Sequence, residues 1–361
     1  MTRARRLLAL ALGSAGTAAL LFACTFTQSL DYLQKGTGAA DVVTETSVDA
    51  GDGGAMREPT VLVPNQTKPG YLAQDDATLY WIAGGNVMSV PKSGGTAKTL
   101  GAVPPNASAL VAEPDPAGAV FVIAGTGVLR VPKDGSAGGV VFAPGATEAP
   151  PDTVAASASA LYVLQYDQSG NIEGSRILRM AKDGGAVTDF APDAGPTTLN
   201  LDPKSVFWLG SDIDKPAIVE QLETAAPGTI TATYALSVND DAPTLSTDIA
   251  IDDAFLYWLA TDATSAAAKV VSRKREAAAS VVAVYRGAPE DSFSLLRLDA
   301  SHVYFIETRT SSLLRVPKIG GDVEPLLTGL KAPSGLAVDA KAVYITVEAT
   351  GSTGQVLVLP K

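Results

Sequence analysis

The chain has 361 residues, of which 46% are hydrophobic and 18% charged, so it can bury one large core or two ordinary ones. Its formal net charge of −11 would repel phosphate backbones, which excludes nucleic acid as an expected partner. The 34 glycines and 23 prolines favour many short strands joined by tight turns.

The first 23 residues have the pattern of an export signal. A basic start is followed by an apolar stretch from Leu7 to Phe22, and Ala23 then precedes Cys24, the only cysteine. The sequence Leu21-Phe22-Ala23-Cys24 resembles the bacterial lipobox, which implies that residues 1–23 are removed and that Cys24 is acylated. The alternative is a transmembrane helix, but the apolar stretch is at the lower limit of about 17–25 residues for a span.

This resemblance implies that the protein is located in the bacterial cell envelope. Cys24 would anchor the chain to a membrane, and Thr25 after the cysteine implies the outer membrane under the enterobacterial sorting pattern. The chain would then face the periplasm or the cell surface. Residues 24–57 are rich in Gly, Ala, Asp and Thr and lack apolar periodicity, so we expect the lipidated cysteine to be followed by a flexible linker.

Residues 58–361 consist of repeats. Each repeat has a step from an aliphatic to an aromatic residue, and most then have a Val-Pro-Lys-like ending followed by glycine. The aromatic residues of the seven steps are Tyr80, Phe121, Tyr162, Phe207, Tyr257, Tyr304 and Tyr344. A period of about 40–50 residues with several short strands in each unit is typical of propeller blades.

The order of signals within a repeat predicts four strands. The first strand ends in an Asp-containing turn, the second carries the aromatic step, the third ends at Pro-Lys, and the fourth follows a glycine turn. The last repeat stops at Lys361 without a fourth strand, and the segment 58–64 has the character of that missing strand. We therefore expect an all-β, seven-bladed propeller of four-stranded antiparallel blades, closed by an N-terminal strand.

The first repeat, with Leu79-Tyr80-Trp81 followed by Gly94-Gly95, resembles the YWTD and TolB-like propellers. The resemblance covers the repeat region but departs where Ile82-Ala83 replaces the Thr-Asp of true YWTD repeats. It implies the fold, and propellers of one fold serve many functions.

Side chains for catalysis are scarce. His302 is the only histidine and occupies a repeat position that also accepts Thr, Ala, Ser and Phe, so we interpret it as an ordinary residue at the start of a strand. One His and one Cys cannot form a His/Cys metal site. Trp81, Trp208 and Trp258 share one repeat position, where packing between blades is favoured over an aromatic cage.

Acidic residues gather in the long connections between second and third strands and between blades, all of which reach one face. We take them as a candidate binding face, which consists of Asp167, Glu173, Asp212, Asp214, Asp240, Asp241, Asp262 and Glu307. No cofactor is predicted, although carboxylates of this kind chelate calcium, which leaves a divalent cation open. Lysines such as Lys92, Lys133 and Lys318 flank the turns of the opposite face. Either the disc is polarised into an acidic and a basic face, or these are ordinary solvated turn charges.

These features favour a membrane-anchored binding or scaffold module over an enzyme. It would be a monomeric propeller that recognises a protein or glycan partner in the envelope through its acidic face. The alternative is a metal-dependent propeller enzyme of the lyase or lactonase type, with carboxylates in the central channel. The first strands that can be identified, such as Leu199 to Leu201 and Leu336 to Val338, are apolar or neutral, which disfavours that alternative. A purely structural member of an envelope complex is a third option.

Overall fold

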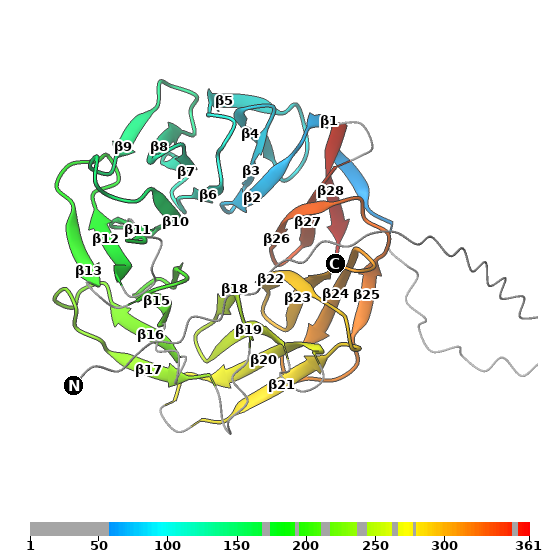
Figure 1. Cartoon of the computed structure of the whole chain (residues 1–361). Coiled ribbons are helices and arrows are strands. Elements are labelled where there is room, and N and C mark those ends of the chain that lie inside the picture. Colours follow the sequence, from blue (N-terminus) through cyan, green and yellow to red (C-terminus); the bar gives the residue numbers. More distant parts are fainter. Residues whose placement is uncertain are drawn as a thin grey trace, which may run out of the picture. The chain divides into compact units, whose positions relative to one another are not determined.

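The computed structural model describes residues 58–167, 174–191, 195–210, 217–236, 244–261, 266–276, 279–348 and 353–361, with the backbone alone for 244–247. The described strands form seven four-stranded antiparallel sheets arranged in a ring (Figure 1). The expected seven-bladed propeller is confirmed. The described residues include no helix that is long and apolar enough to cross a membrane.

In blades 1 to 6, the strands follow the chain order from the inside of the ring outward (Figure 1). Blades 1 to 3 consist of β2 (Gly70–Gln74), β3 (Thr78–Ala83), β4 (Asn86–Pro91) and β5 (Lys98–Ala102); β6 (Ala109–Ala112), β7 (Ala119–Ala124), β8 (Gly127–Pro132) and β9 (Gly139–Phe142); and β10 (Pro151–Ala156), β11 (Leu161–Gln165), β12 (Arg176–Met180) and β13 (Thr188–Ala191). Blades 4 to 6 consist of β14 (Asn200–Leu201), β15 (Ser205–Gly210), β16 (Ala217–Leu222) and β17 (Ala232–Ala235); β18 (Thr244–Ile251), β19 (Phe255–Thr261), β20 (Ala268–Lys274) and β21 (Val281–Arg286); and β22 (Phe293–Leu298), β23 (His302–Glu307), β24 (Ser312–Pro317) and β25 (Glu324–Leu327).

Blade 7 joins the two ends of the propeller. Its strands are β26 (Pro333–Val338), β27 (Ala342–Glu348), β28 (Thr353–Pro360) and the N-terminal β1 (Thr60–Thr67). Strand β1 pairs antiparallel with β28, with Val61 opposite Leu357 and Thr67 opposite Thr353. This is the closure expected from the leftover segments of the sequence. It supplies the outer strand of the last blade, so no blade is left one strand short.

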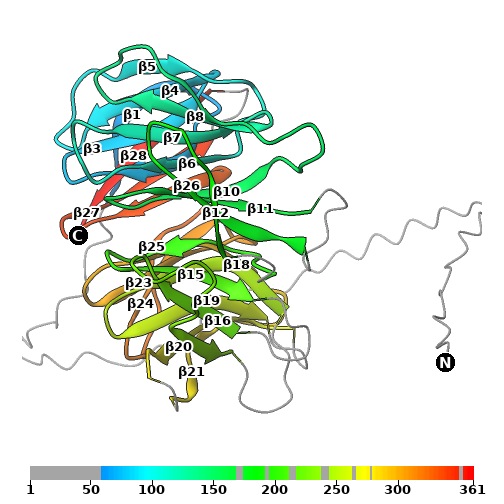
Figure 2. The same ribbon diagram turned by 90° about the vertical axis from the view of Figure 1, so that its left-hand side faces the viewer.

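The antiparallel pairing sorts the connections onto two faces of the ring (Figure 2). We call the face with the links between first and second strands and between third and fourth strands the tight-turn face. The other face, with the links between second and third strands and between blades, is the loop face. Glycines permit the turns of the tight-turn face: Gly94 and Gly320, with φ of 90° and 84°, are in the left-handed region.

The hydrophobic core lies between the blades. Buried side chains form separate clusters, each shared by two neighbouring sheets; one cluster joins Tyr162 and Phe190 of blade 3 to Trp208 of blade 4. Trp258 likewise packs against blade 4, and Trp81 packs against blade 7. All three tryptophans are at most 1% exposed, so their interpretation as packing between blades is confirmed.

Candidate functional site

The long links between second and third strands, which lie on the loop face, belong to three consecutive blades. In blade 1, β3 and β4 are joined by Gly84 and Gly85 alone, whereas in blade 3 the link between β11 and β12 spans residues 166–175. The corresponding links of blades 4 and 5 span 211–216 and 262–267, and residues 236–243 join blade 4 to blade 5. The strands that flank these four connections all end on the loop face. The long loops of this half of the ring could therefore form a binding surface for a partner.

Most of the predicted acidic residues belong to these connections. Six of them lie outside the described residues: Glu173, Asp212, Asp214, Asp240, Asp241 and Asp262. Asp167 follows β11, lies among the described residues and is partly exposed. A Cβ added to Gly174 would lie 2.8 Å from the Cβ of Asp167. Since only glycine fits there, the two ends of this long connection approach each other closely. Cys24 also lies outside the described residues.

Glu307 has a role within its own hairpin. The residue is only 4% exposed. Its carboxylate accepts hydrogen bonds from the backbone N–H groups of Arg309 and Thr310, both at 2.7 Å. The Thr310 hydroxyl is a third donor. The structure therefore places Glu307 at the loop face, with its carboxylate turned into the turn between β23 and β24.

Carboxylates and cations alternate on the tight-turn face. A Lys or Arg at the end of a third strand forms an ion pair with a carboxylate after the first strand of the preceding blade. These pairs are Lys92–Asp339, Lys133–Asp75, Lys182–Glu113, Arg275–Asp202, Lys318–Asp252 and Lys361–Asp299. The lysines on which a basic face would depend are thus neutralised by the neighbouring blade. The polarised disc with a basic face is therefore wrong as an interpretation of these residues.

The Asp75 carboxylate both stabilises a turn of its own blade and binds a lysine of the next blade. Its Oδ1 accepts the backbone N–H groups of Ala77 and Thr78, which fixes the turn after β2. Its Oδ2 accepts the Tyr80 hydroxyl at 2.7 Å and the Lys133 ammonium at 2.8 Å. Burial alone raises the pKa of Asp75, but these hydrogen bonds outweigh it, so the pKa lies below the usual value.

The seam between blades 3 and 4 lacks this ion pair. Ser157 takes the place of the carboxylate and holds the turn with its hydroxyl, which accepts the N–H of Ser159 at 3.1 Å. Glu223 takes the place of the cation, and the Ser159 hydroxyl donates to it at 3.3 Å. One neutral hydrogen-bond donor thus replaces the ammonium or guanidinium group found at the other seams.

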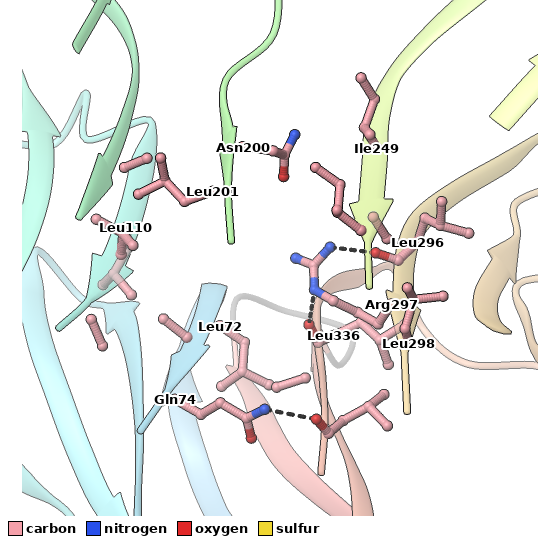
Figure 3. Close-up of a pocket in the computed structure, with 18 of the residues that line it drawn as sticks. Leu72, Gln74, Leu110, Asn200, Leu201, Ile249, Leu296, Arg297, Leu298 and Leu336 are labelled. Carbon is pink, nitrogen blue, oxygen red and sulfur yellow. Dashed lines mark hydrogen bonds between the residues drawn. The ribbon is translucent and has the colours of Figure 1, made fainter. Parts of the chain in front are cut away.

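The central channel is lined by the first strand of every blade and has a volume of about 610 Å³ (Figure 3). Most of its side chains are aliphatic, and the polar exceptions are Gln74, Asn200 and Arg297. The Arg297 Nε donates to the Leu336 carbonyl at 2.9 Å and its Nη1 to the Leu296 carbonyl at 2.7 Å. The Gln74 amide donates to the Val338 carbonyl at 2.8 Å. Polar side chains from three blades therefore line one channel.

His302 stands at the start of β23, as expected. Its backbone N–H donates to Asp299 at 2.7 Å, and its ring Nδ1 lies 2.8 Å from the Ser301 hydroxyl. Burial and the charge of Arg315 lower the pKa of His302, so its ring is neutral at pH 7. Within the described part of the chain, no three His, Cys, Asp or Glu side chains are grouped so that they could hold a metal ion.

Arg297 is not among the site residues predicted from the repeats, because only some of the first strands could be identified from the sequence. Aligned on the turn that follows each strand, Arg297 falls at the position held by Ala73, Val111, Ala155, Asn200, Ala250 and Ala337. A single charge among small or neutral residues is a signal that a full alignment of the seven repeats would have shown. Asn200, the other polar residue at this position, was included in the analysis but treated as neutral lining.

No protein-family model matches the chain, and no curated protein matches its sequence. Solved structures match its fold. A structure of oligogalacturonate lyase in complex with manganese has a TM-score of 0.64 and 13% identity, covering 83% of this chain and 91% of that one. A chain of a mitotic checkpoint complex has a TM-score of 0.58 and 10% identity, covering 90% and 99%. A prolyl endopeptidase structure has a TM-score of 0.55 and 12% identity, covering 83% and 50%. At these identities the likeness shows the propeller fold alone.

Proposed function

We propose that this chain is an exported, lipid-anchored propeller that binds a protein or glycan of the bacterial envelope through its loop face. The observation that carries the proposal is the contrast between the two faces. The tight-turn face is occupied by ion pairs between blades, whereas the long connections of blades 3 to 5 all emerge on the loop face. The acidic residues predicted in these connections would give the loop face a negative charge.

The position of β1 supports the same arrangement. Strand β1 begins at Thr60, beside Val358 and close to the tight-turn face, so the linker joins the propeller on that side. An acylated Cys24 would hold the chain at the membrane from there, with the loop face left accessible. The linker of residues 24–57 is long enough to allow the disc to turn toward a partner.

The metal-dependent enzyme remains the alternative for a propeller of this shape, since one structural neighbour is a lyase in complex with manganese. The cationic Arg297 in the channel disfavours it, because a guanidinium group raises the energy of a nearby metal cation. The binding module is therefore the better-supported function.

Anchoring is tested by expressing the full chain in a bacterial host fed with an alkyne-tagged fatty acid. We expect the chain to be labelled and to sediment with membranes, and the Cys24→Ala variant to lose the label and be released. Labelling of the Cys24→Ala variant, or an unlabelled parent, would overturn the lipid anchor.

Binding through the loop face is tested with a photo-crosslinking amino acid in the intact envelope. We expect adducts from a probe at Asp167 on the loop face and from one at Asp214 in the connection between β15 and β16, and none from a probe at Asp322 in the glycine turn between β24 and β25. Neutralising Asp212 and Asp214 to Asn should weaken the adducts, whereas Asp322→Asn should not. Equal adducts from both faces, or none from the loop face, would count against the proposal.

A further inference from the structure

The walls of the channel are made of strand edges. In each blade the first strand pairs with the second on one side only, so its other backbone edge faces the channel. Two carbonyls of β26, those of Leu336 and Val338, accept hydrogen bonds from Arg297 and Gln74. These carbonyls are two residues apart, about 7 Å along the strand. The two polar side chains are therefore held on neighbouring parts of one wall.

Arg297 carries a charge that the described residues leave without a carboxylate partner. It makes two hydrogen bonds, both to backbone carbonyls, and no ion pair with a described residue. Both N–H bonds of Nη2 and one of Nη1 have no acceptor among the described residues. Burial lowers the pKa of Arg297, while the negative charge of Asp248 raises it. The guanidinium thus has a free pair of donors in a site that disfavours an uncompensated charge.

Gln74 and Asn200 add neutral polar groups to the lining of the channel. The Oε1 atom of Gln74 is buried and accepts no hydrogen bond from the described residues. Asn200 shares the repeat position of Arg297, and Figure 3 shows its amide beside the space into which the guanidinium points. Between them in the ring stands Ala250, whose small side chain leaves that space open.

The other residues that line the cavity indicate the chemical class of a ligand. Leu110, Leu201 and Leu298 are partly exposed aliphatic residues of the lining, whereas Leu72 and Ile249 are buried between blades. The cavity volume of about 610 Å³ lies within the usual range for small-molecule sites, about 300–1,000 Å³. No Asp or Glu of the described residues lines this cavity, so none of them would hold the ammonium group of an amino acid. A single guanidinium balances one negative charge, whereas a phosphate dianion would leave an excess charge away from water.

We propose that the central channel binds a small aliphatic monocarboxylate, whose carboxylate is held by the Nη1 and Nη2 donors of Arg297. The planar fork of a guanidinium matches a carboxylate in a bidentate arrangement. The aliphatic body lies against the partly exposed side chains of Leu110, Leu201 and Leu298. This site is separate from the loop face and does not depend on the proposed function.

Hexanoate is a suitable probe, with 1-hexanol, hexylamine and inorganic phosphate as comparators. Calorimetry and saturation-transfer NMR on the full chain should show saturable hexanoate binding, with a dissociation constant on the order of 1 mM or tighter. The alcohol and the amine should bind at least about 10-fold more weakly, because neither can accept a charge-assisted pair from Arg297. Phosphate should not displace hexanoate. Displacement by phosphate, or equal binding of hexanol, would overturn the carboxylate site.

Substitutions locate the site. Arg297→Met should weaken hexanoate binding about 10- to 100-fold, and Arg297→Lys should weaken it less, because the charge stays but the fork is lost. Arg130→Met, which removes an arginine of β8 away from the channel lining, should leave binding unchanged. If Arg297→Met does not fold, Ala250→Leu provides the test, since it fills the same level of the channel and should abolish binding. Unchanged binding in either channel variant would overturn the proposal.

Discussion

The Lys133 ammonium of blade 2 lies 2.8 Å from the Asp75 carboxylate of blade 1, and each of the two side chains is only 3% exposed. Lys133 also donates to the carbonyls of Glu113 and Asp115, and it lies over the Tyr80 ring. Both charged groups therefore have further hydrogen-bond partners, and the pair links the sheets of two neighbouring blades. Among the ion pairs of the tight-turn face, it has the least exposed partners.

Removing the cation of this pair should destabilise the propeller strongly. Lys133→Met leaves the Asp75 carboxylate buried without its counter-charge, and breaking a buried pair in this way costs about 3–5 kcal/mol. Lys98→Met on the exposed face of β5 is the matched control and should change the free energy of unfolding by less than about 0.5 kcal/mol. Urea unfolding of the two variants checks the prediction. Similar small losses in both would mean that the pair between blades contributes little.

Acid should weaken the same face. Burial raises the pKa of Asp252 and Asp339, but hydrogen bonds from Lys318 and Lys92 and from backbone N–H groups outweigh it, so both pKa values lie below normal. A carboxyl with a lowered folded-state pKa stabilises the fold above its unfolded pKa of about 3.9, and this stability is lost as the pH falls through the lower folded value.

The free energy of unfolding should therefore be nearly constant from about pH 7 to 5 and fall steeply below about pH 4. Urea midpoints measured from pH 3 to 7 check this expectation. The drop should be shallower in Lys133→Met, in which Asp75 no longer has a lysine to lower its pKa. A parent protein whose stability is unchanged at pH 3 would contradict the argument.

The sequence predicted the repeats because each blade repeats its own local signals. The aromatic step at Tyr80 and the glycine turn at Gly94 specify strands and turns within one sheet, and the leftover segment at β1 indicated how the ring closes. The pairing of Lys133 with Asp75 depends on which residues of two different sheets face each other. No pattern within a single blade contains that information, so the lysines were interpreted as free surface charges.

For the candidate site, too, the sequence predicted features that depend on local signals and missed those that depend on contacts in the folded chain. The long connections were visible as insertions between repeats, because their lengths can be read once Tyr162, Phe207 and Tyr257 are aligned. The inward turn of the Glu307 carboxylate depends on the N–H groups of Arg309 and Thr310, which only the folded hairpin brings together. Arg297 needed a comparison of all seven first strands at one position, which relates residues far apart in the chain.

The seam between blades 3 and 4 should gain stability from the arrangement used elsewhere in the ring. Ser157→Asp combined with Glu223→Lys would place a carboxylate opposite an ammonium group, as in Lys318–Asp252. Ser157→Asp alone should destabilise the fold, because it brings a second carboxylate close to Glu223. A double-mutant cycle in urea should give a favourable coupling of about 0.5–3 kcal/mol. A coupling near zero would show that these two positions do not face each other in solution.

Strand β1 offers a matched pair of positions for testing the closure of the ring. Val63 is 5% exposed and packs with Leu72 and Trp81, whereas Val61, two residues earlier in the same strand, is 50% exposed. Val63→Asp places an unpaired charge in the layer between blades 7 and 1, so it should destabilise the fold by at least about 3 kcal/mol. Val61→Asp should cost less than about 1 kcal/mol, since its side chain stays in water.

Hydrogen exchange distinguishes a local effect from a global one in these two variants. If β1 holds the last blade closed, Val63→Asp should expose the amides of β28 that pair with β1, near Val356 and Val358, to faster exchange than the amides of blade 4. Val61→Asp should leave both regions protected. Equal acceleration throughout the propeller would instead mean that the ring opens as one cooperative unit, with β1 no weaker than any other strand.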